Sequence, residues 1–222
     1  VDEVRYVTLD PQGMKIYESL ETSSYAELLK GEVVVRNILT QLLRLQQVTG
    51  GFIRDDKGGP VQQVSKAKLM ALEEIIDDVL GEGKKLVIFA RFVPEIDAIS
   101  KLLAEKGIRH SVISGEIKNR SEQVQQFQEN PEVKVFVGQI QTTGLGLTLT
   151  AANTAIFYSM DFNYANYSQA RARIHRIGQR NTCTYIHLVA KDTIDEKVLK
   201  ALQRKEDVAK LLVDNWHTFF RR

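Results

Sequence analysis

Apolar positions follow two different patterns along the chain, and the change occurs near residue 84. Before it, apolar residues recur every three or four positions, which predicts amphipathic helices. These helices are expected at 11–29, 34–48 and 65–79. Pro11 suits the start of the first helix, and Ser65 suits the cap of the third. Residues 4–9 indicate a short strand and residues 55–60 a loop.

From Lys85 onward, short apolar runs alternate with helical patterns. Residues 86–90 read Leu-Val-Ile-Phe-Ala, a run typical of a strand that is covered on both faces. Further strands are expected at 111–113, 133–137, 154–158 and 184–189, and helices at 95–105, 121–128, 167–174 and 194–213. Strands and helices that alternate with short links require a parallel sheet with right-handed crossovers. The predicted fold class is α/β, a three-layer parallel sheet in residues 84–222 with an N-terminal strand and helical brace segment in residues 1–83.

The composition is that of an ordinary globular protein, with 222 residues, 43% apolar and 26% charged. Since no run approaches 18 apolar residues, we expect no membrane span. Cys183 is the only cysteine, which excludes an internal disulfide and suits a reducing cytoplasm or nucleus. The histidines lie at 110, 175, 187 and 217. Because their spacing matches no metal-ligand pattern, we expect no metal to be held by this chain alone.

Positive charge gathers toward the C-terminus, although the net charge is only +2. Residues 1–80 hold nine Lys and Arg against 13 Asp and Glu, whereas residues 164–222 hold 12 against six. Such a bias fits either a solvated face or a surface for nucleic-acid phosphates.

The N-terminal residues carry no secretory signal, since Val1-Asp2-Glu3-Val4-Arg5 lacks a basic and an apolar region. The chain starts without Met and reaches strand-like sequence almost at once, so we expect it to be part of a longer polypeptide. Its Asp-Glu pair imitates a metal-binding Asp-Glu box. Because it ends no buried strand, we interpret the match as coincidence.

The first candidate site is the segment 139–149, directly after a predicted buried strand. Ligands of open parallel sheets bind beyond the carboxyl ends of the strands. Gly144 and Gly146 would let the backbone approach a ligand, and Thr142 and Thr143 offer groups that suit phosphate oxygens. A glycine-rich turn with a purely structural role fits this segment equally well.

The second candidate site is the segment 169–180, which holds Arg173 and Arg176. Three positions apart on a predicted helix, their guanidinium groups would leave the same face. A triphosphate would satisfy two such cations, because charge that develops on a transferring phosphoryl group requires fixed planar donors. A basic helix that faces water, or one that contacts nucleic-acid phosphates, remains an alternative interpretation.

The segment 169–179, Gln-Ala-x-x-Arg-x-His-Arg-Ile-Gly-Gln, resembles the sixth motif of Swi/Snf-type ATPases in helicase superfamily two. RNA helicases of the DEAD-box class share the start His-Arg-x-Gly, but their pattern then requires Arg where this chain has Gln179 and Thr182. The Gln-x-x-x-Arg-x-x-Arg register, in contrast, is complete at Gln169, Arg173 and Arg176.

Other segments are similar to the same family in order and spacing. Residues 85–92 resemble its fourth motif, the Gly144 and Gly146 turn its fifth, and Asp161-Phe162-Asn163-Tyr164 a segment that often reads Asp-Trp-Asn-Pro. Within the fifth motif the family usually has Arg and Asn where this chain has Gln141 and Thr148. The loss of a positive charge there should weaken contact with phosphates.

The resemblance implies a RecA-like C-terminal lobe of an ATP-driven translocase or remodeller of double-stranded DNA. In such enzymes ATP and Mg are bound mainly by an N-terminal RecA-like lobe of the same polypeptide, which would be the partner of this chain. Arg173 and Arg176 would then act as arginine fingers. The residues expected to line the nucleotide cleft are Gly144, Gly146 and Gln169, and those expected to approach the DNA backbone are Gln141, Thr142, Phe162 and Asn163.

No Gly-x-x-x-x-Gly-Lys-Ser/Thr sequence is present, so the chain alone is expected to be inactive as an ATPase. Two alternatives stay open. One is a superfamily-two lobe that acts on RNA or in a restriction system, and the other is a non-catalytic nucleic-acid-binding module. We expect an intracellular protein, either cytoplasmic and of a bacterial or phage-like kind, or nuclear.

Overall fold

The computed structural model describes residues 1–30, 35–54, 58–115, 118–142, 146–206 and 208–220. Its strands are β1 (Asp2–Val7), β2 (Phe52–Arg54), β3 (Val61–Gln63), β4 (Lys85–Ala90), β5 (His110–Ile113), β6 (Val135–Gln139), β7 (Ala152–Phe157) and β8 (Thr184–Ala190). Its helices are α1 (Pro11–Lys30), α2 (Val35–Thr49), α3 (Ala67–Gly81), α4 (Val93–Glu105), α5 (Arg120–Glu129), α6 (Tyr164–Arg171), α7 (Ile194–Gln203), α8 (Val208–Asp214) and α9 (Trp216–Phe220).

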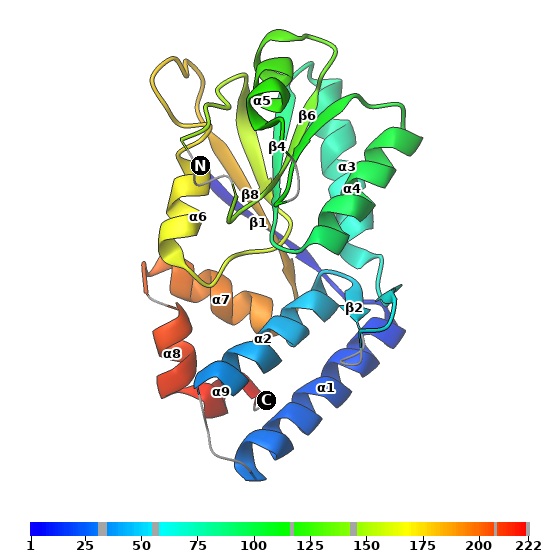
Figure 1. Ribbon diagram of the computed structural model, residues 1–222, viewed down its shortest axis with the longest axis vertical. Coiled ribbons are helices and arrows are strands. Elements are labelled where there is room, and N and C mark those ends of the chain that lie inside the picture. Colours follow the sequence, from blue (N-terminus) through cyan, green and yellow to red (C-terminus); the bar gives the residue numbers. More distant parts are fainter. Residues whose placement is uncertain (31–34, 55–57, 116–117, 143–145, 207, 221–222) are drawn as a thin grey trace. The chain divides into compact units, whose positions relative to one another are not determined.

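A six-stranded sheet forms the centre of the fold, with the strand order β1-β8-β7-β4-β6-β5 (Figure 1). Strand β4 pairs in parallel with β6 on one side and with β7 on the other. Strand β1 follows β8 in the same direction, because Tyr185 N donates to Val1 O and Lys191 N to Val7 O. The predicted α/β class, a parallel sheet preceded by helices, is confirmed.

The chain forms two compact units, and the first holds Val1–Arg5, Leu69–Asp161 and Ala165–Leu188. Alternate side chains of its strands point to opposite faces of the sheet, and each face is covered by helices. Leu86 and Ile88 of β4 join one apolar cluster with residues of α3 and α4. On the other face, Phe127 of α5 packs on Phe136 of β6, and Phe89 of β4 packs on Phe157 of β7. These are the three layers that the alternating elements predict.

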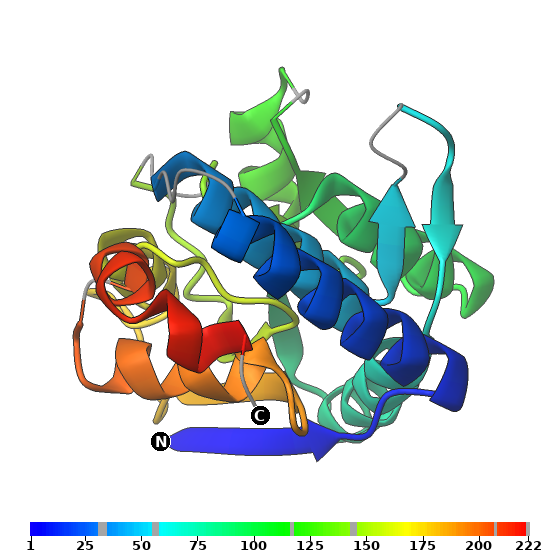
Figure 2. The same cartoon turned by 90° about the horizontal axis from the view of Figure 1, so that it is seen from below.

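The second unit holds Tyr6–Lys68, Phe162–Tyr164 and Val189–Arg222. Helices α1 and α2 lie side by side in it (Figure 2), and Ser24 Oγ of α1 donates to Gln41 Oε1 of α2 over 2.8 Å. The ring of Tyr25 packs on Trp216 of α9, with the ring centroids 5.7 Å apart. Residues from both ends of the sequence therefore build one helical unit. The boundary at residue 84 stays a prediction.

A buried carboxylate joins four segments of this second unit. Asp195, near the start of α7, forms an ion pair with Lys68 Nζ at 2.6 Å, and both side chains are about 1% exposed. Its Oδ1 accepts a hydrogen bond from Thr49 Oγ1 at 2.9 Å, and its Oδ2 accepts one from Ala190 N at 3.1 Å. The carboxylate is thus well satisfied, as a charged group in a protein interior must be.

Two features differ from the sequence-based expectation. The antiparallel pair β2 and β3 was not predicted, because strands of three residues are too short to show an alternating pattern. The helix expected at 194–213 is broken after Gln203. Lys205 adopts a φ of 57°, and Glu206 N donates to Ala201 O, which is the hydrogen bonding of a helix C-terminus.

Removal of the Lys68 charge should destabilise the chain strongly. We expect Lys68→Met to lower the free energy of unfolding by about 3–5 kcal/mol, because it leaves the Asp195 carboxylate buried without a counter-charge. Lys68→Met/Asp195→Asn should recover part of that loss, since no charge is then buried. Urea unfolding measures both. The control is Lys101→Met, whose ammonium is 77% exposed, and it should change the stability by less than about 1 kcal/mol. Equal effects of the two single substitutions would contradict the analysis.

The buried ring of His187 should make stability depend on pH. Burial lowers the pKa of His187 from 6.5 to about 4, and its ring stacks on Phe157 with centroids 5.1 Å apart. The unfolded chain takes up this proton at a higher pH than the folded chain does. The contribution of the neutral ring to the free energy of unfolding is therefore fully present above pH 6.5. It is lost as the pH drops toward 4, a decrease of roughly 3 kcal/mol. Urea unfolding from pH 7 to pH 4 should show a shallower loss for His187→Asn than for the wild type. Identical pH profiles would show that His187 is not the cause.

Candidate nucleotide and nucleic-acid site

Helix α6 ends at Arg171, earlier than the expected end near Ile174, and this changes how the two candidate arginines are held. The backbone carbonyl of Arg173 accepts a hydrogen bond from Leu149 N at 3.0 Å. That of Ile174 accepts one from Gln179 Nε2 at 3.1 Å. Arg173 N donates to Ala170 O, three residues back instead of four, and Arg171 O accepts from Tyr185 Oη at 3.0 Å, so the α-helical hydrogen bonding ends here. The expectation that Arg173 and Arg176 share a helix face is wrong, since both lie in the turns that follow α6.

The turns nevertheless hold Arg173 and Arg176 close to the segment between β6 and β7. Arg176 Nη1 donates to Gly146 O at 2.6 Å, to Leu147 O at 3.2 Å and to Thr148 Oγ1 at 3.1 Å. All three of these hydrogen bonds leave from one nitrogen of the guanidinium group. The side chain of Arg176 is exposed, whereas that of Arg173 is buried.

The two guanidinium groups disfavour each other. Burial, together with the positive charge of Arg176, lowers the pKa of Arg173 from its ordinary value. An arginine keeps its proton even so, because its unperturbed pKa lies above 12. The pair thus places two positive charges of like sign near each other, and an anionic ligand would be favoured beside them.

The residues expected to line a nucleotide cleft are only partly described. Gly146 has a φ of 75°, a backbone conformation that favours glycine, and a Cβ there would meet no atom within 4 Å. Gln169 is exposed on α6. Gly144 lies outside the described residues. The structure brings Gly146 to Arg176 through a backbone hydrogen bond.

The four residues expected to approach DNA differ in exposure. Gln141 is exposed, while Thr142 is half-buried and its hydroxyl donates to Gln139 O at 3.0 Å. Both belong to the first unit. Phe162 and Asn163 belong to the second unit, where the ring of Phe162 is buried and the amide of Asn163 is exposed.

A buried polar cluster follows the carboxyl ends of the central strands and was not singled out from the sequence. Arg91 directly follows β4, and its guanidinium lies 3.8 Å from Asp161. Burial lowers the pKa of Arg91, while the charges of Asp161 and Glu95 oppose that shift. Ser159 Oγ accepts from Arg91 N at 2.8 Å and donates to Glu95 Oε2 at 2.5 Å. The signal for this cluster in the sequence was Arg91, a charged residue immediately after an apolar strand.

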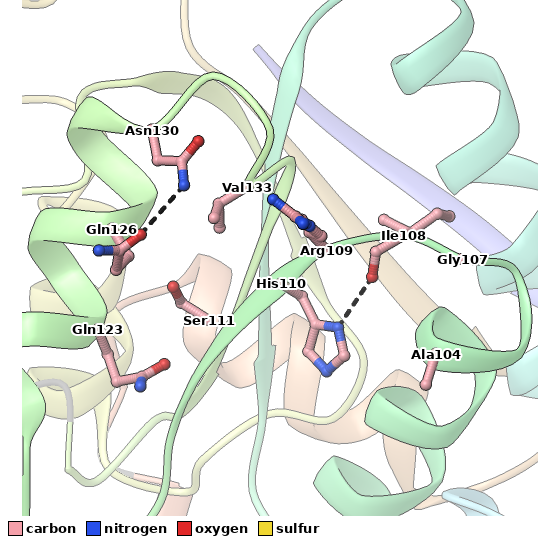
Figure 3. Close-up of a pocket in the computed structure, with 10 residues that line it drawn as sticks. All are labelled: Ala104, Gly107, Ile108, Arg109, His110, Ser111, Gln123, Gln126, Asn130 and Val133. Carbon is pink, nitrogen blue, oxygen red and sulfur yellow. Dashed lines mark hydrogen bonds between the residues drawn. The ribbon is translucent and has the colours of Figure 1, made fainter.

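A cavity of about 560 Å³ lies elsewhere in the first unit, beside the edge strand β5 (Figure 3). Its lining residues are Ala104, Gly107, Ile108, Arg109, His110, Ser111, Gln123, Gln126, Asn130 and Val133. At this edge, Val112 N donates to Gln123 Oε1 of α5 at 3.1 Å. Since none of the candidate residues line the cavity, it is separate from the site described above.

Within the described parts of the chain, no helix is both long and apolar enough to cross a membrane. Likewise, those residues include no group of three or more His, Cys, Asp or Glu side chains that could hold a metal ion.

Residues 67–178 match the family of the helicase conserved C-terminal domain. An ATP-dependent helicase of Mycoplasma genitalium is 31% identical over 218 residues, which cover 96% of this chain and 21% of that protein. The chromatin-remodeling ATPase INO80 of Candida albicans is 37% identical over 150 residues, 67% of this chain and 11% of that protein. The chain thus spans about a fifth or less of these relatives' length.

Among solved structures, the chain is similar to the SWI2/SNF2 ATPase core of Sulfolobus solfataricus in complex with double-stranded DNA. The TM-score is 0.77 at 27% identity, and the match covers 97% of this chain and 46% of that one. This chain belongs to the family of helicase conserved C-terminal domains, and within that family it is a C-terminal lobe of the Swi/Snf type.

Proposed function

We propose that this chain is the second motor lobe of an ATP-driven translocase or remodeller of double-stranded DNA. The observation that carries the proposal is the pair Arg173 and Arg176, held by the loop between β6 and β7 at the carboxyl-end side of a parallel sheet. That edge is where ligands of such sheets bind. The related Sulfolobus structure, whose chain is about twice as long, is a complex with double-stranded DNA.

Arg173 and Arg176 would act on the phosphoryl group that is transferred from ATP. Burial lowers the pKa of Arg173, and the charge of Arg176 lowers it further. A phosphate placed between the two cations would offset that repulsion. The hydrogen bonds from Arg176 Nη1 to the loop fix the orientation of its planar guanidinium group, and with it the direction of Nη2. A planar donor that is already oriented stabilises developing charge without having to reorganise during the reaction.

The binding of ATP and Mg would belong mainly to an N-terminal RecA-like lobe of the same polypeptide. Mg bridges the phosphates and neutralises charge as the phosphoryl group leaves. From this side of the cleft, Gln169 would contact the nucleotide, and the turn at Gly144 and Gly146 would let the backbone approach it. Because ATP and DNA meet inside cells, this function places the protein in the cytoplasm or the nucleus.

Contacts with DNA would come from Gln141, Thr142 and Asn163, with Phe162 as a support. The exposed amides of Gln141 and Asn163 can donate hydrogen bonds to phosphate oxygens. The ring of Phe162 is buried, so it would hold Asn163 in place rather than touch the strand itself. Such contacts position the protein on DNA without reading the base sequence.

Substitution of either arginine by lysine in the full-length parent tests the role in phosphoryl transfer. Lysine keeps the charge but loses the planar fork, so Arg173→Lys and Arg176→Lys should each lower DNA-stimulated ATP turnover by about 10³–10⁵. DNA affinity should stay within a few-fold. Steady-state ATPase assays and fluorescence anisotropy with duplex DNA measure the two quantities. Arg180→Lys, an exposed arginine of the same segment, is the control and should leave both unchanged. Retained turnover with collapsed DNA binding would identify the arginines as backbone contacts.

The isolated chain should bind DNA without hydrolysing ATP. It has no Gly-x-x-x-x-Gly-Lys-Ser/Thr sequence to hold the phosphates of ATP. Phosphate release, measured with and without duplex DNA, should therefore equal that of a buffer blank. DNA-stimulated turnover that copurifies with this chain and disappears in Arg173→Ala would refute the proposal that a second lobe is required.

A further inference from the structure

The strand β1 is tied to the helix α6 by a bidentate ion pair. Both Nη atoms of Arg171, the last residue of α6, donate to the carboxylate of Asp2, with Nη2 and Oδ2 3.0 Å apart. Arg171 Nη1 also donates to Tyr167 Oη at 3.0 Å. The guanidinium stacks on the ring of Tyr185 in β8, with its central carbon 3.8 Å from the ring centroid. Arg171 is therefore held from three sides within the first unit.

A second link between β1 and α6 runs through the buried ring of His187. His187 Nδ1 lies 3.2 Å from Glu3 O, and Nε2 lies 2.8 Å from Tyr167 Oη. A carbonyl can only accept, so Nδ1 carries the proton of the neutral ring. Nε2 then accepts from the hydroxyl of Tyr167, whose oxygen in turn accepts from Arg171. The hydrogen bonds thus form one continuous path from Asp2 to Glu3, in which Arg171 Nη1 donates both to Asp2 and to Tyr167.

These two links fix the orientation of α6 at points one helical turn apart. Tyr167 and Arg171 are four residues apart and lie on the same side of the helix. The helix has eight residues, carries Gln169, and leads within two residues to Arg173. A tilt of α6 would therefore displace Gln169 and the start of the turns that hold Arg173 and Arg176.

We propose that Asp2 and Arg171 are positioning residues for the arginine pair, and that the first residues of the chain thereby set the geometry of phosphoryl transfer. The inference rests on the proposed function of Arg173 and Arg176. It assigns a role to the Asp2-Glu3 pair that resembled a metal-binding box. Asp2 acts as the counter-ion of Arg171, and the backbone of Glu3 as the acceptor for His187.

If Asp2 and Arg171 have a positioning role, removal of the ion pair lowers turnover. If their role is purely structural, its removal lowers folding stability. The side chains of Arg171 and Asp2 are 26% and 49% exposed, and ion pairs with this much exposure contribute little to folding stability. Reactive geometry is far more sensitive, because a displacement of about 1 Å can cost on the order of 10² in rate. Loss of the pair should therefore reduce turnover while the fold persists.

The test uses Asp2→Asn and Asp2→Glu in the full-length parent. Asp2→Asn removes the charge that orients Arg171, and we expect the kcat for DNA-stimulated ATP hydrolysis to fall about 10-fold to 100-fold. The KM for ATP, the dissociation constant for duplex DNA and the melting temperature should change little. Asp2→Glu restores the carboxylate and should recover most of kcat. Arg171→Lys keeps the charge without the fork, and its kcat should fall as in Asp2→Asn.

The matched control is Glu73→Gln/Asp77→Asn, which frees Lys106. That ion pair joins α3 to α4 in the same unit, and the side chains of Lys106 and Glu73 are 24% and 42% exposed, close to the values for Arg171 and Asp2. The control should keep the wild-type kcat. An equal kcat loss in the control and in Asp2→Asn would overturn the inference, as would a loss that follows a lower melting temperature.

Arg173→Lys, measured in parallel, separates the two proposals. If it abolishes turnover while Asp2→Asn and Arg171→Lys keep the wild-type kcat, the positioning role is refuted and the proposed function stands. If Arg173→Lys also keeps the wild-type kcat, both proposals fall.

Discussion

The carboxylate of Asp195 is the point on which the helical unit depends. It lies in the interior together with the ammonium of Lys68, and it also accepts hydrogen bonds from Thr49 and from the backbone of Ala190. A buried charge is tolerated only where its partners are all in place. The end of α2, the start of α3, the end of β8 and the start of α7 must therefore meet around it. Apolar packing could hold these segments in several registers, whereas the carboxylate admits one arrangement.

The candidate site also depends on charged side chains held in place, but here both charges are positive. Arg173 and Arg176 follow α6 in a series of turns, in which Arg173 O accepts from the distant Leu149 N and Ile174 O accepts from the side chain of Gln179. The turns hold the two cations in place. In the same unit, Arg91 and Asp161 form a pair in which burial is offset by opposite charge. The charges of Arg173 and Arg176 have the same sign, which favours an anionic ligand beside them.

Local patterns predicted the elements that are determined locally. The apolar run 86–90 gave the central strand β4, and helical periodicity gave α1 to α3, because burial on one or two faces leaves a periodic trace. The end of α6 could not be predicted in this way, since the group that takes the carbonyl of Arg171, the last residue of the helix, is the hydroxyl of Tyr185 in β8. The break after Gln203 depends on Lys205, which adopts a left-handed conformation. A glycine at this position would have indicated the helix end in the sequence, but a lysine does not.

The same distinction applies to the site. The motif spacing predicts that Arg173 and Arg176 act as a pair, and that role stays a prediction. The structure places both in turns rather than on a helix. The contact between Asp2 and Arg171 spans 169 positions along the chain, and no local pattern contains both residues. Contacts of this kind become visible only when the sheet brings β1 beside β8 and places α6 against it.

The amide of Gln123 matters for a reason apart from the proposed function. Strand β5 is the last strand at its end of the sheet, and the backbone groups of such a strand can pair with a strand of another molecule. Gln123 Oε1 accepts the hydrogen bond of Val112 N, so this backbone donor is already occupied within the chain. A strand of another molecule would have to displace that amide before it could pair with Val112.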